Sequence, residues 1–354
     1  MNSMKHTKTS CKTRIIVLLL CCVGMLLPLS ACGEKKPVEQ QIFAMDTLMD
    51  LKAYGKNAET GINDAVAVIN GLNAMLDPEL ESSKVYAINH AQGDSVVVNG
   101  QIAKMIQTAQ TVSQQTDDAL DLTVYPLLRA WGFIDADYRV PDDATIEALL
   151  EQVDMQKVQL TAMGDDGSYL VSVPAGAELS FGAVAKGCAS NYAINAMRAA
   201  GVTSGVISLG GNVQTLGTKP DGSDWNVAVQ DPNDTGDYIG YVSVGETAVI
   251  TSGSYQRCFT QNGKLYHHII DPATGEPAEN KLQSVTIVCP DGILADCLST
   301  AMFVLGETDA LAYWRDHGGF EMILITTDGR VVLTNGLYGK FTPNGDRYEY
   351  SYVK

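Results

Sequence analysis

The chain has 354 residues, 45% of them hydrophobic and 18% charged, which is enough apolar material for a sizeable core and excludes a largely disordered protein. Its length suggests two domains or one large one. Acidic residues outnumber lysine and arginine by 41 to 24, for a formal net charge of −17. The four basic residues of positions 1–31 stand in a segment without acids, so the rest is more acidic still. Such a body argues against nucleic-acid binding, which needs a basic face.

The N-terminal segment is typical of a secretory signal. Residues 4–14 are basic, and residues 15–29 form an almost wholly apolar run too short for a comfortable membrane span. The run ends in Leu29-Ser30-Ala31-Cys32-Gly33, which resembles the lipobox of bacterial lipoproteins; an ordinary signal peptide or an uncleaved anchor is the alternative. We expect a signal peptide over 1–31, a lipid on Cys32 and a tether over 32–41. The mature protein would then be anchored to the cell membrane on its extracytoplasmic face.

The body, residues 42–354, shows no internal linker and reads as helices mixed with short strands and hairpins. In chain order we expect a strand over 45–54, helices over 60–76, 99–116 and 142–153, a hairpin of 158–160 with 169–173, a helix over 187–200, strands over 205–209, 225–230, 241–244, 248–251 and 284–289, a helix over 294–305, and a hairpin of 322–326 with 330–334. This order favours an α+β fold over a doubly wound parallel sheet.

Four cysteines remain after Cys32, with no CxxC or Cys/His spacing that would suit zinc. An oxidising compartment would permit disulfides, but the sequence does not pair them. We interpret them as small buried residues. They are Cys188, Cys258, Cys289 and Cys297.

One glycine-rich segment is suited to binding an anion. Ser180-Phe181-Gly182-Ala183-Val184-Ala185-Lys186-Gly187 stands where a loop enters a helix. Glycines there let backbone N–H groups approach an anion, the helix dipole favours negative charge, and Lys186 adds a positive one. A tight packing turn with a surface lysine is the alternative interpretation.

A second segment offers oxygen ligands. Asp296 and Thr300 are four residues apart on a predicted helix and therefore share a face. A carboxylate and a hydroxyl suit a hard cation such as Mg²⁺, although two side chains are too few for a closed cage. The alternative is a helix N-terminal charge and a half-buried threonine.

His267 and His268 precede an Asp-Pro-x-Thr-Gly turn, and strand alternation would point them to opposite faces. One could serve as acid or base near neutral pH, or simply be a hydrogen-bonded loop histidine. The chain carries no GxSxG, Walker A or Rossmann fingerprint, so those mechanisms have no support.

Taken together, seven ordered motifs resemble the ApbE family, the FAD:protein FMN transferases first labelled thiamine-biosynthesis lipoproteins. The resemblance covers residue 42 to the C-terminus. The motifs are Met45-Asp46-Thr47, Asp121-Leu122-Thr123-Val124 with Trp131-Gly132-Phe133, Gly182–Gly187, Gly210-Gly211-Asn212, Thr251-Ser252-Gly253-Ser254-Tyr255, His268-Ile269-Ile270-Asp271-Pro272 with Thr274-Gly275, and Ala295-Asp296 with Ser299-Thr300.

The resemblance implies an α+β fold around a cleft and a Mg²⁺-dependent reaction. FAD is split at its pyrophosphate, FMN passes to a threonine or serine hydroxyl of an extracytoplasmic target protein, and AMP leaves. It places the metal on Asp296, Thr300 and the carbonyl of Ala183, and makes His268 the candidate acid/base. The FAD contacts it implies are Met45, Glu79, Ala119, Leu120, Asp121, Ser180, Lys186 and Ile270.

Two positions depart from the family pattern. Ser180 replaces a common aspartate, which removes bidentate recognition of the flavin nucleotide, and Ser299 stands where some members carry a second acid. Two other functions stay open, the first because some family members resemble it and the second because of these two departures. One is a Mg²⁺-dependent FAD pyrophosphatase that yields FMN and AMP, and the other is a lipid-tethered FAD-binding protein without catalysis.

Overall fold

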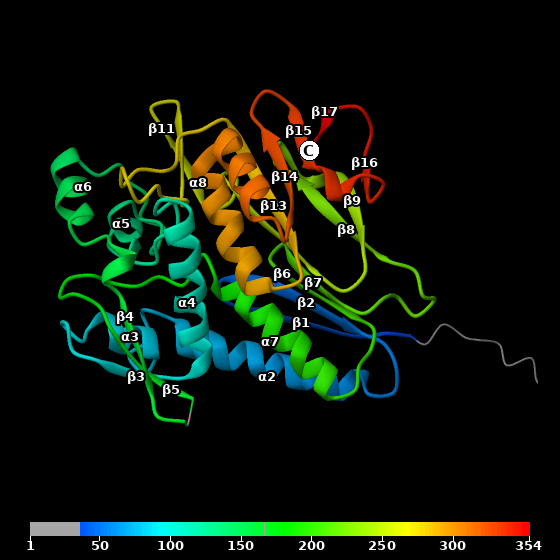
Figure 1. Cartoon of the computed structure of the whole chain (residues 1–354), viewed down its shortest axis with the longest axis horizontal. Coiled ribbons are helices and arrows are strands. Elements are labelled where there is room, and N and C mark those ends of the chain that lie inside the picture. The colour runs from blue at the N-terminus through cyan, green and yellow to red at the C-terminus, as the bar shows by residue number, and fades with distance from the viewer. Residues whose placement is uncertain (1–35, 166) are drawn as a thin grey trace, which may run out of the picture. The chain divides into compact units, whose positions relative to one another are not determined.

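The computed structural model describes residues 36–165 and 167–354, so the predicted signal peptide and Cys32 lie outside the described residues. Residues 37–354 form one compact unit built on a nine-stranded sheet of order β1-β2-β6-β7-β10-β13-β14-β15-β17 (Figure 1). Neighbouring strands are antiparallel except β15 and β17, which are parallel. The strands are β1 (Val38–Ala44), β2 (Thr47–Ala53), β6 (Gly205–Leu209), β7 (Asn212–Leu216), β10 (Ala248–Gly253), β13 (Leu282–Cys289), β14 (Glu321–Thr326), β15 (Arg330–Thr334) and β17 (Glu349–Val353).

Three smaller sheets accompany the large one. They are β3 (Val96–Val98), β5 (Ser168–Ser172) and β4 (Gln159–Met163); β16 (Phe341–Pro343), β9 (Asp234–Val244) and β8 (Trp225–Asp231); and the hairpin β11 (Cys258–Gln261) with β12 (Lys264–His267). The helices are α2 (Ala58–Leu76), α3 (Lys84–Asn89), α4 (Gly100–Gln115), α5 (Tyr125–Ala130), α6 (Asp143–Leu150), α7 (Ala185–Ala199) and α8 (Gly292–His317). The predicted α+β class is confirmed.

Strand alternation divides the core into two layers. On β6, Ile207 and Leu209 point into the larger apolar cluster, which joins the sheet to α2, α7 and α8 (Figure 1). On β14, Ile323 and Ile325 point the other way and pack with Val227 and its neighbours in β8 and β9. Helices therefore cover one face of the large sheet, and the β16-β9-β8 sheet covers part of the other.

Several boundaries differ from the sequence-based expectation: the strand expected over 45–54 begins at Thr47, after a turn at Met45 and Asp46, and the strand expected over 241–244 begins at Asp234. Strand β1 begins at Val38, so the last four residues of the predicted tether belong to the sheet. Helix α8 does not end at Leu305 but continues through a kink at Gly306, where φ is 76°, to His317. Burial of Leu311 and Tyr313 stabilises the continuation. A glycine in a sequence predicts the end of a helix, and this tertiary packing outweighs that local signal.

The four cysteines of the described residues are free thiols. Cys188, Cys289 and Cys297 are buried, as expected, whereas Cys258 is only partly so. Burial raises the pKa of the Cys188 thiol to about 12, which makes it a poor nucleophile at neutral pH.

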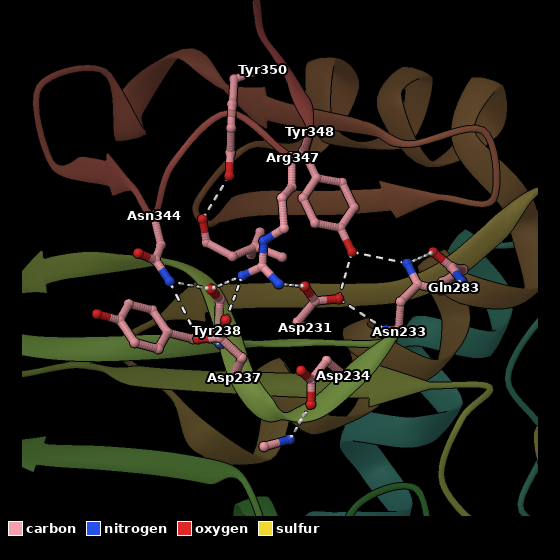
Figure 2. A network of polar contacts seen from close by, with 12 residues as sticks. Asp231, Asn233, Asp234, Asp237, Tyr238, Gln283, Asn344, Arg347, Tyr348 and Tyr350 are labelled. Atoms are coloured by element: carbon pink, nitrogen blue, oxygen red, sulfur yellow. Dashed lines mark hydrogen bonds and ion pairs between the residues drawn. The ribbon is translucent and has the colours of Figure 1, made fainter.

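A buried polar network ties the C-terminal segment to the β8–β9 hairpin (Figure 2). Asp231, 2% exposed at the end of β8, accepts hydrogen bonds from the Tyr348 hydroxyl (2.5 Å) and the Asn233 N–H (2.9 Å). It also forms an ion pair of 3.1 Å with Arg347, whose other nitrogen lies 2.6 Å from Asp237. Because the Asp231 carboxylate and the Arg347 guanidinium both have partners within the chain, we interpret this network as stabilising the fold.

Candidate active site

Two helices begin at one point in the structure. A Cβ added to Gly187, in the first turn of α7, would lie 2.1 Å from the carbonyl oxygen of Gly292 and 2.6 Å from the Cβ of Asp296. A Cβ on Gly292 would lie 2.9 Å from the Gly187 carbonyl oxygen. No larger residue fits at these distances, so the two glycines allow the backbones of α7 and α8 to touch. This contact brings the N–H groups of α7 to the side chain of Asp296.

Asp296 is held at both of its carboxylate oxygens. The residue is 3% exposed. Its Oδ2 accepts a hydrogen bond of 2.7 Å from the Gly187 N–H, and its Oδ1 accepts one of 3.0 Å from the side-chain amide of Asn212. An acid at a helix N-terminus is favoured by the helix dipole and by the unpaired N–H groups there. The carboxylate is therefore fixed in one orientation.

The same hydrogen bond leaves a carbonyl available. The Gly187 N–H donates to Asp296 and not to Ala183, the residue four positions earlier. Within residues 36–165 and 167–354 the structure shows no backbone hydrogen bond to the Ala183 carbonyl. Ala183 is half-buried in the loop that leads into α7. Its oxygen is thus a main-chain acceptor still able to take a ligand.

Three hydroxyl groups meet one turn further along α8. The Ser252 Oγ, on β10, lies 2.8 Å from the Ser299 Oγ and 3.2 Å from the Thr300 Oγ1. The Ser299 hydroxyl donates to the Asp296 carbonyl at 2.8 Å. Thr300 is half-buried, whereas Ser299 is completely buried. Of the two, only Thr300 is open to a ligand.

These donors fit a magnesium ion. A fixed carboxylate on Asp296, the hydroxyl of Thr300 and the spare carbonyl of Ala183 are all hard oxygen ligands. The described part of the chain contains no cluster of three or more His, Cys, Asp or Glu residues that would hold a metal by themselves. Mg²⁺ commonly keeps several waters and takes substrate phosphate oxygens as well, so an incomplete protein set is what it requires.

His268 lies in a positively charged and partly buried environment. Burial, followed by the charges of Arg257 and Lys186, lowers the pKa of His268 to about 3. Its Nδ1 is buried without a hydrogen-bond partner among the described residues. Arg257 also forms an ion pair of 3.5 Å with Asp46 in the β1–β2 turn, next to Met45. The structure thus brings His268 and Lys186 within electrostatic reach of each other.

The neighbouring His267 has a different environment. It is 7% exposed and its ring meets Phe303 of α8 edge-on, with centroids 5.5 Å apart. The ring of His268 instead lies 6.5 Å from that of Phe133. The two histidines therefore contact different parts of the core, and burial lowers the pKa of His267 to about 4.

Motifs distant in sequence meet around Trp131. Its indole N–H donates a 2.9 Å hydrogen bond to the carbonyl of Gly275, at the end of the Asp-Pro-x-Thr-Gly turn. Ile270 is packed in the same apolar cluster as Trp131 and Phe133. The structure thus joins the tryptophan motif to the segment that follows His268.

Several expected FAD contacts already have partners within the chain. Asp121, Ala119 and Leu120 are buried. The Asp121 carboxylate accepts hydrogen bonds from the N–H and hydroxyl of Thr123 and from the Met155 N–H, so it orders this loop. Burial raises its pKa, and the Thr123 hydrogen bonds oppose that rise.

Ser180 and Glu79 are the other two polar contacts expected from the resemblance. The Ser180 N–H donates to the Leu122 carbonyl at 2.7 Å, and its hydroxyl accepts from the Gly182 N–H at 3.3 Å. Glu79 accepts a hydrogen bond from the Tyr125 hydroxyl. Ser180 therefore lies directly before the Gly182–Val184 turn that leads into α7, whereas Glu79 belongs to a separate contact with Tyr125.

Sequence reasoning did not select three residues that the structure places in the site. Asn212 orients Asp296, Ser252 contacts Thr300, and Arg257 acts on His268. Asn212 and Ser252 stand within noted motifs, so residue type and motif membership were available as a signal. Arg257 carried no such sequence signal, because its position near His268 depends on the turn after β10.

A cleft of about 480 Å³ opens elsewhere, between β8 and the strands β6, β7 and β10. Val213 and Thr251 line it, whereas their neighbours Asn212 and Ser252 point toward α8. The cleft is therefore on the opposite face of the large sheet from Asp296. We place the chemistry at Asp296, because the oxygen donors gather there.

Oxygen ligands suited to a hard cation lie at the start of two helices, with Lys186 in the first turn of α7, and this arrangement suits an enzyme that acts on a phosphate-containing substrate. The ApbE family model matches residues 45–324. The FAD:protein FMN transferase of Klebsiella pneumoniae is 34% identical over 301 residues, which cover 84% of this chain and 92% of that protein. The FAD:protein FMN transferase of Treponema pallidum is 30% identical and covers 93% and 96%.

Comparison with solved structures points to the same family as the sequence comparison. The ApbE protein of Thermotoga maritima superimposes with a TM-score of 0.80 at 29% identity and covers 86% of this chain and 99% of that one. The apo flavinyl transferase ApbE of Pseudomonas stutzeri gives 0.76 at 25% identity, with 89% and 99% covered. The chain belongs to the ApbE family.

Proposed function

We propose that this chain is an FAD:protein FMN transferase that requires Mg²⁺ and attaches FMN to a threonine or serine hydroxyl of an extracytoplasmic protein. The observation that carries the proposal is the Asp296 carboxylate, fixed by Gly187 at the start of α7 and by Asn212, with Thr300 one turn further along the same helix face. Relatives that align over most of the chain bear the name of this activity. FAD is the substrate, and its pyrophosphate is the anion that the start of α7 would receive.

In the proposed reaction the acceptor hydroxyl oxygen forms a bond to the flavin-side phosphorus of FAD. The bond from that phosphorus to the bridging oxygen breaks, and AMP leaves with the bridging oxygen. Mg²⁺, held by Asp296, Thr300 and Ala183, would neutralise negative charge on the phosphoryl group. Lys186 and the N-terminus of α7 add fixed positive potential at the same anion.

His268 would take the proton of the acceptor hydroxyl. Its lowered pKa keeps the imidazole unprotonated in the free enzyme from about pH 5 to 8, but a base with so low a pKa is weak. The two negative charges of a bound pyrophosphate would offset Lys186 and Arg257 and raise the basicity of His268. Substrate binding would thus make the base stronger where it is needed.

We expect His268→Asn to lower kcat/KM for FMN transfer by about a hundredfold or more, because general base catalysis is lost. Since kcat/KM reports the free enzyme, the ratio of wild type to variant should stay level between pH 5.5 and 7.5. A ratio that falls steadily below pH 6.5 would mean that the imidazole titrates normally. FAD affinity, measured by flavin fluorescence, should change little and serves as the control.

The decisive test incubates the protein with FAD, Mg²⁺ and a protein domain that bears an acceptor threonine. Mass spectrometry follows the acceptor and chromatography follows the nucleotides. One FMN on the acceptor with AMP released, and inhibition by EDTA, would support the transferase. Free FMN and AMP without labelling would indicate the pyrophosphatase, and intact bound FAD would indicate a binding protein.

We propose that a lipid on Cys32 anchors the protein at the extracytoplasmic face of the cell membrane. Among the described residues, the helices are too short or too polar to span a bilayer. Because Cys32→Ala removes the proposed lipid attachment site, we expect this variant to move from the membrane pellet to the soluble fraction. Continued sedimentation of the variant with membranes would argue for an uncleaved leader.

A further inference from the structure

The hydroxyl groups of Ser252, Ser299 and Thr300 form a cluster in which the hydrogen-bond partners determine which hydroxyl donates and which accepts. A hydroxyl carries one proton. The Ser299 proton is used in the bond to the Asp296 carbonyl, since a carbonyl can only accept. In the 2.8 Å contact with Ser252, Ser299 must therefore be the acceptor and Ser252 the donor.

The same reasoning applies to the next contact. Ser252 has given its proton to Ser299, so it can only accept in its 3.2 Å contact with Thr300. The Thr300 proton then points at Ser252. The lone pairs of the Thr300 oxygen are turned away from Ser252, and within the described ranges no donor uses them. A hydroxyl that binds a cation must present lone pairs and not its proton to the ion.

We propose that Ser252 is a positioning residue that, together with Ser299, orients the Thr300 hydroxyl for metal binding; the inference rests on the proposed Mg²⁺-dependent function. The chain of donors runs from Thr300 through Ser252 and Ser299 to the Asp296 carbonyl. Ser252 touches neither substrate nor metal in this arrangement. It acts on the ion through Thr300.

The proposal also accounts for serine at position 299. The residue is completely buried and its hydroxyl has a donor and an acceptor within the chain. A buried carboxylate at this position would need different partners. Ser299 thus serves as a link in the hydrogen-bond chain rather than as a weakened metal ligand.

The test measures Mn²⁺ binding to the full chain without FAD or acceptor, by loss of the free-ion signal in electron paramagnetic resonance. We expect Ser252→Ala to weaken Mn²⁺ binding about tenfold, the size typical of losing a partner that orients a ligand. Ser254→Ala is the matched control. That hydroxyl, two residues away, donates to the Gln283 carbonyl and should leave Mn²⁺ affinity unchanged.

A double-mutant cycle separates positioning from a general structural role. If Ser252 acts only through Thr300, the variant carrying both Ser252→Ala and Thr300→Val should bind Mn²⁺ no more weakly than Thr300→Val alone. Ser299→Ala provides a second break in the chain and should also weaken binding, because Ser252 would then turn its proton to Thr300. It replaces Ser252→Ala if that variant does not fold.

Unchanged Mn²⁺ affinity in both serine variants would overturn the proposal, as would additive effects of Ser252→Ala and Thr300→Val. Wild-type protein that binds no Mn²⁺ would overturn the metal assignment along with it. The Mn²⁺ measurement contains no flavin, so it is independent of the transfer reaction. If the serine variants weaken Mn²⁺ binding as expected but no acceptor is labelled with FMN, the transferase proposal fails and the role of Ser252 stands.

Discussion

Asp296→Asn should lower the rate of FMN transfer by about a thousandfold, corresponding to about 4 kcal/mol of lost transition-state stabilisation. The variant removes the single carboxylate proposed to bind Mg²⁺ while preserving the shape of the side chain. Mg²⁺ titration of single-turnover transfer measures the effect. The residual rate should no longer depend on the metal.

The structural effect of this change should be modest but measurable. The carboxylate accepts hydrogen bonds from Gly187 and Asn212, and an asparagine oxygen can keep only one of them. The other buried donor would face an NH₂ group, at a cost of about 1–3 kcal/mol. Thermal unfolding should therefore show a destabilised but folded protein, which separates loss of chemistry from loss of fold.

The matched control is Asp291→Asn, five residues earlier, at the N-cap of the same helix. Asp291 caps α8 by accepting a 2.9 Å hydrogen bond from the Ile293 N–H. Asparagine caps a helix about as well as aspartate, so this variant removes a nearby charge without breaking the cap. It should transfer FMN within a few-fold of wild type. An Asp296→Asn protein that kept a tenth of its activity would refute the assignment of the metal.

Asp231→Ala should destabilise the protein by about 3 kcal/mol. The substitution leaves the buried Tyr348 hydroxyl and the Asn233 N–H without their shared acceptor and breaks the ion pair with Arg347 (Figure 2). Arg347 is itself half-exposed, so water can take over part of its solvation. Guanidinium chloride unfolding measures the shift in midpoint.

Asp237→Ala is the comparison for this second prediction. Asp237 binds the same arginine, at 2.6 Å, but its side chain is 38% exposed, and solvent screens such a pair. Its loss should shift the midpoint far less than the loss of Asp231. Equal shifts from the two variants would mean that the arginine, and not the buried carboxylate, stabilises this corner of the fold.

The sequence predicted the helices whose apolar residues repeat at helical spacing, including α2, α4 and α7. It missed β1, because the strand alternates polar residues such as Glu39 and Gln41 on its exposed side and stands directly after a polar segment. Its strand character comes from pairing with β2, residue by residue from Val38 to Ala44. Such a partner is a property of the fold and not of the local pattern.

The candidate site shows the same difference between what a local pattern predicts and what depends on contacts made by the fold. Asp296 and Thr300 share a helix face, so their proximity followed from spacing alone. The approach of Ser252 to Thr300 joins β10 to α8 across 48 positions, and it depends on how the helix lies over the sheet. Ordered motifs therefore indicated which segments take part, whereas the contacts between segments required the structure.

The backbone contact between Gly187 and Gly292 has a consequence for the thermodynamics of cation binding. It holds α7, which follows the Ala183 loop, against α8, which carries Asp296. The Ala183 carbonyl and the Asp296 carboxylate therefore cannot move independently of each other. The conformational entropy of bringing them together is lost when the chain folds and not when the ion arrives. Cation binding should accordingly order few residues, and a methyl group at either glycine would loosen the site by separating its supports.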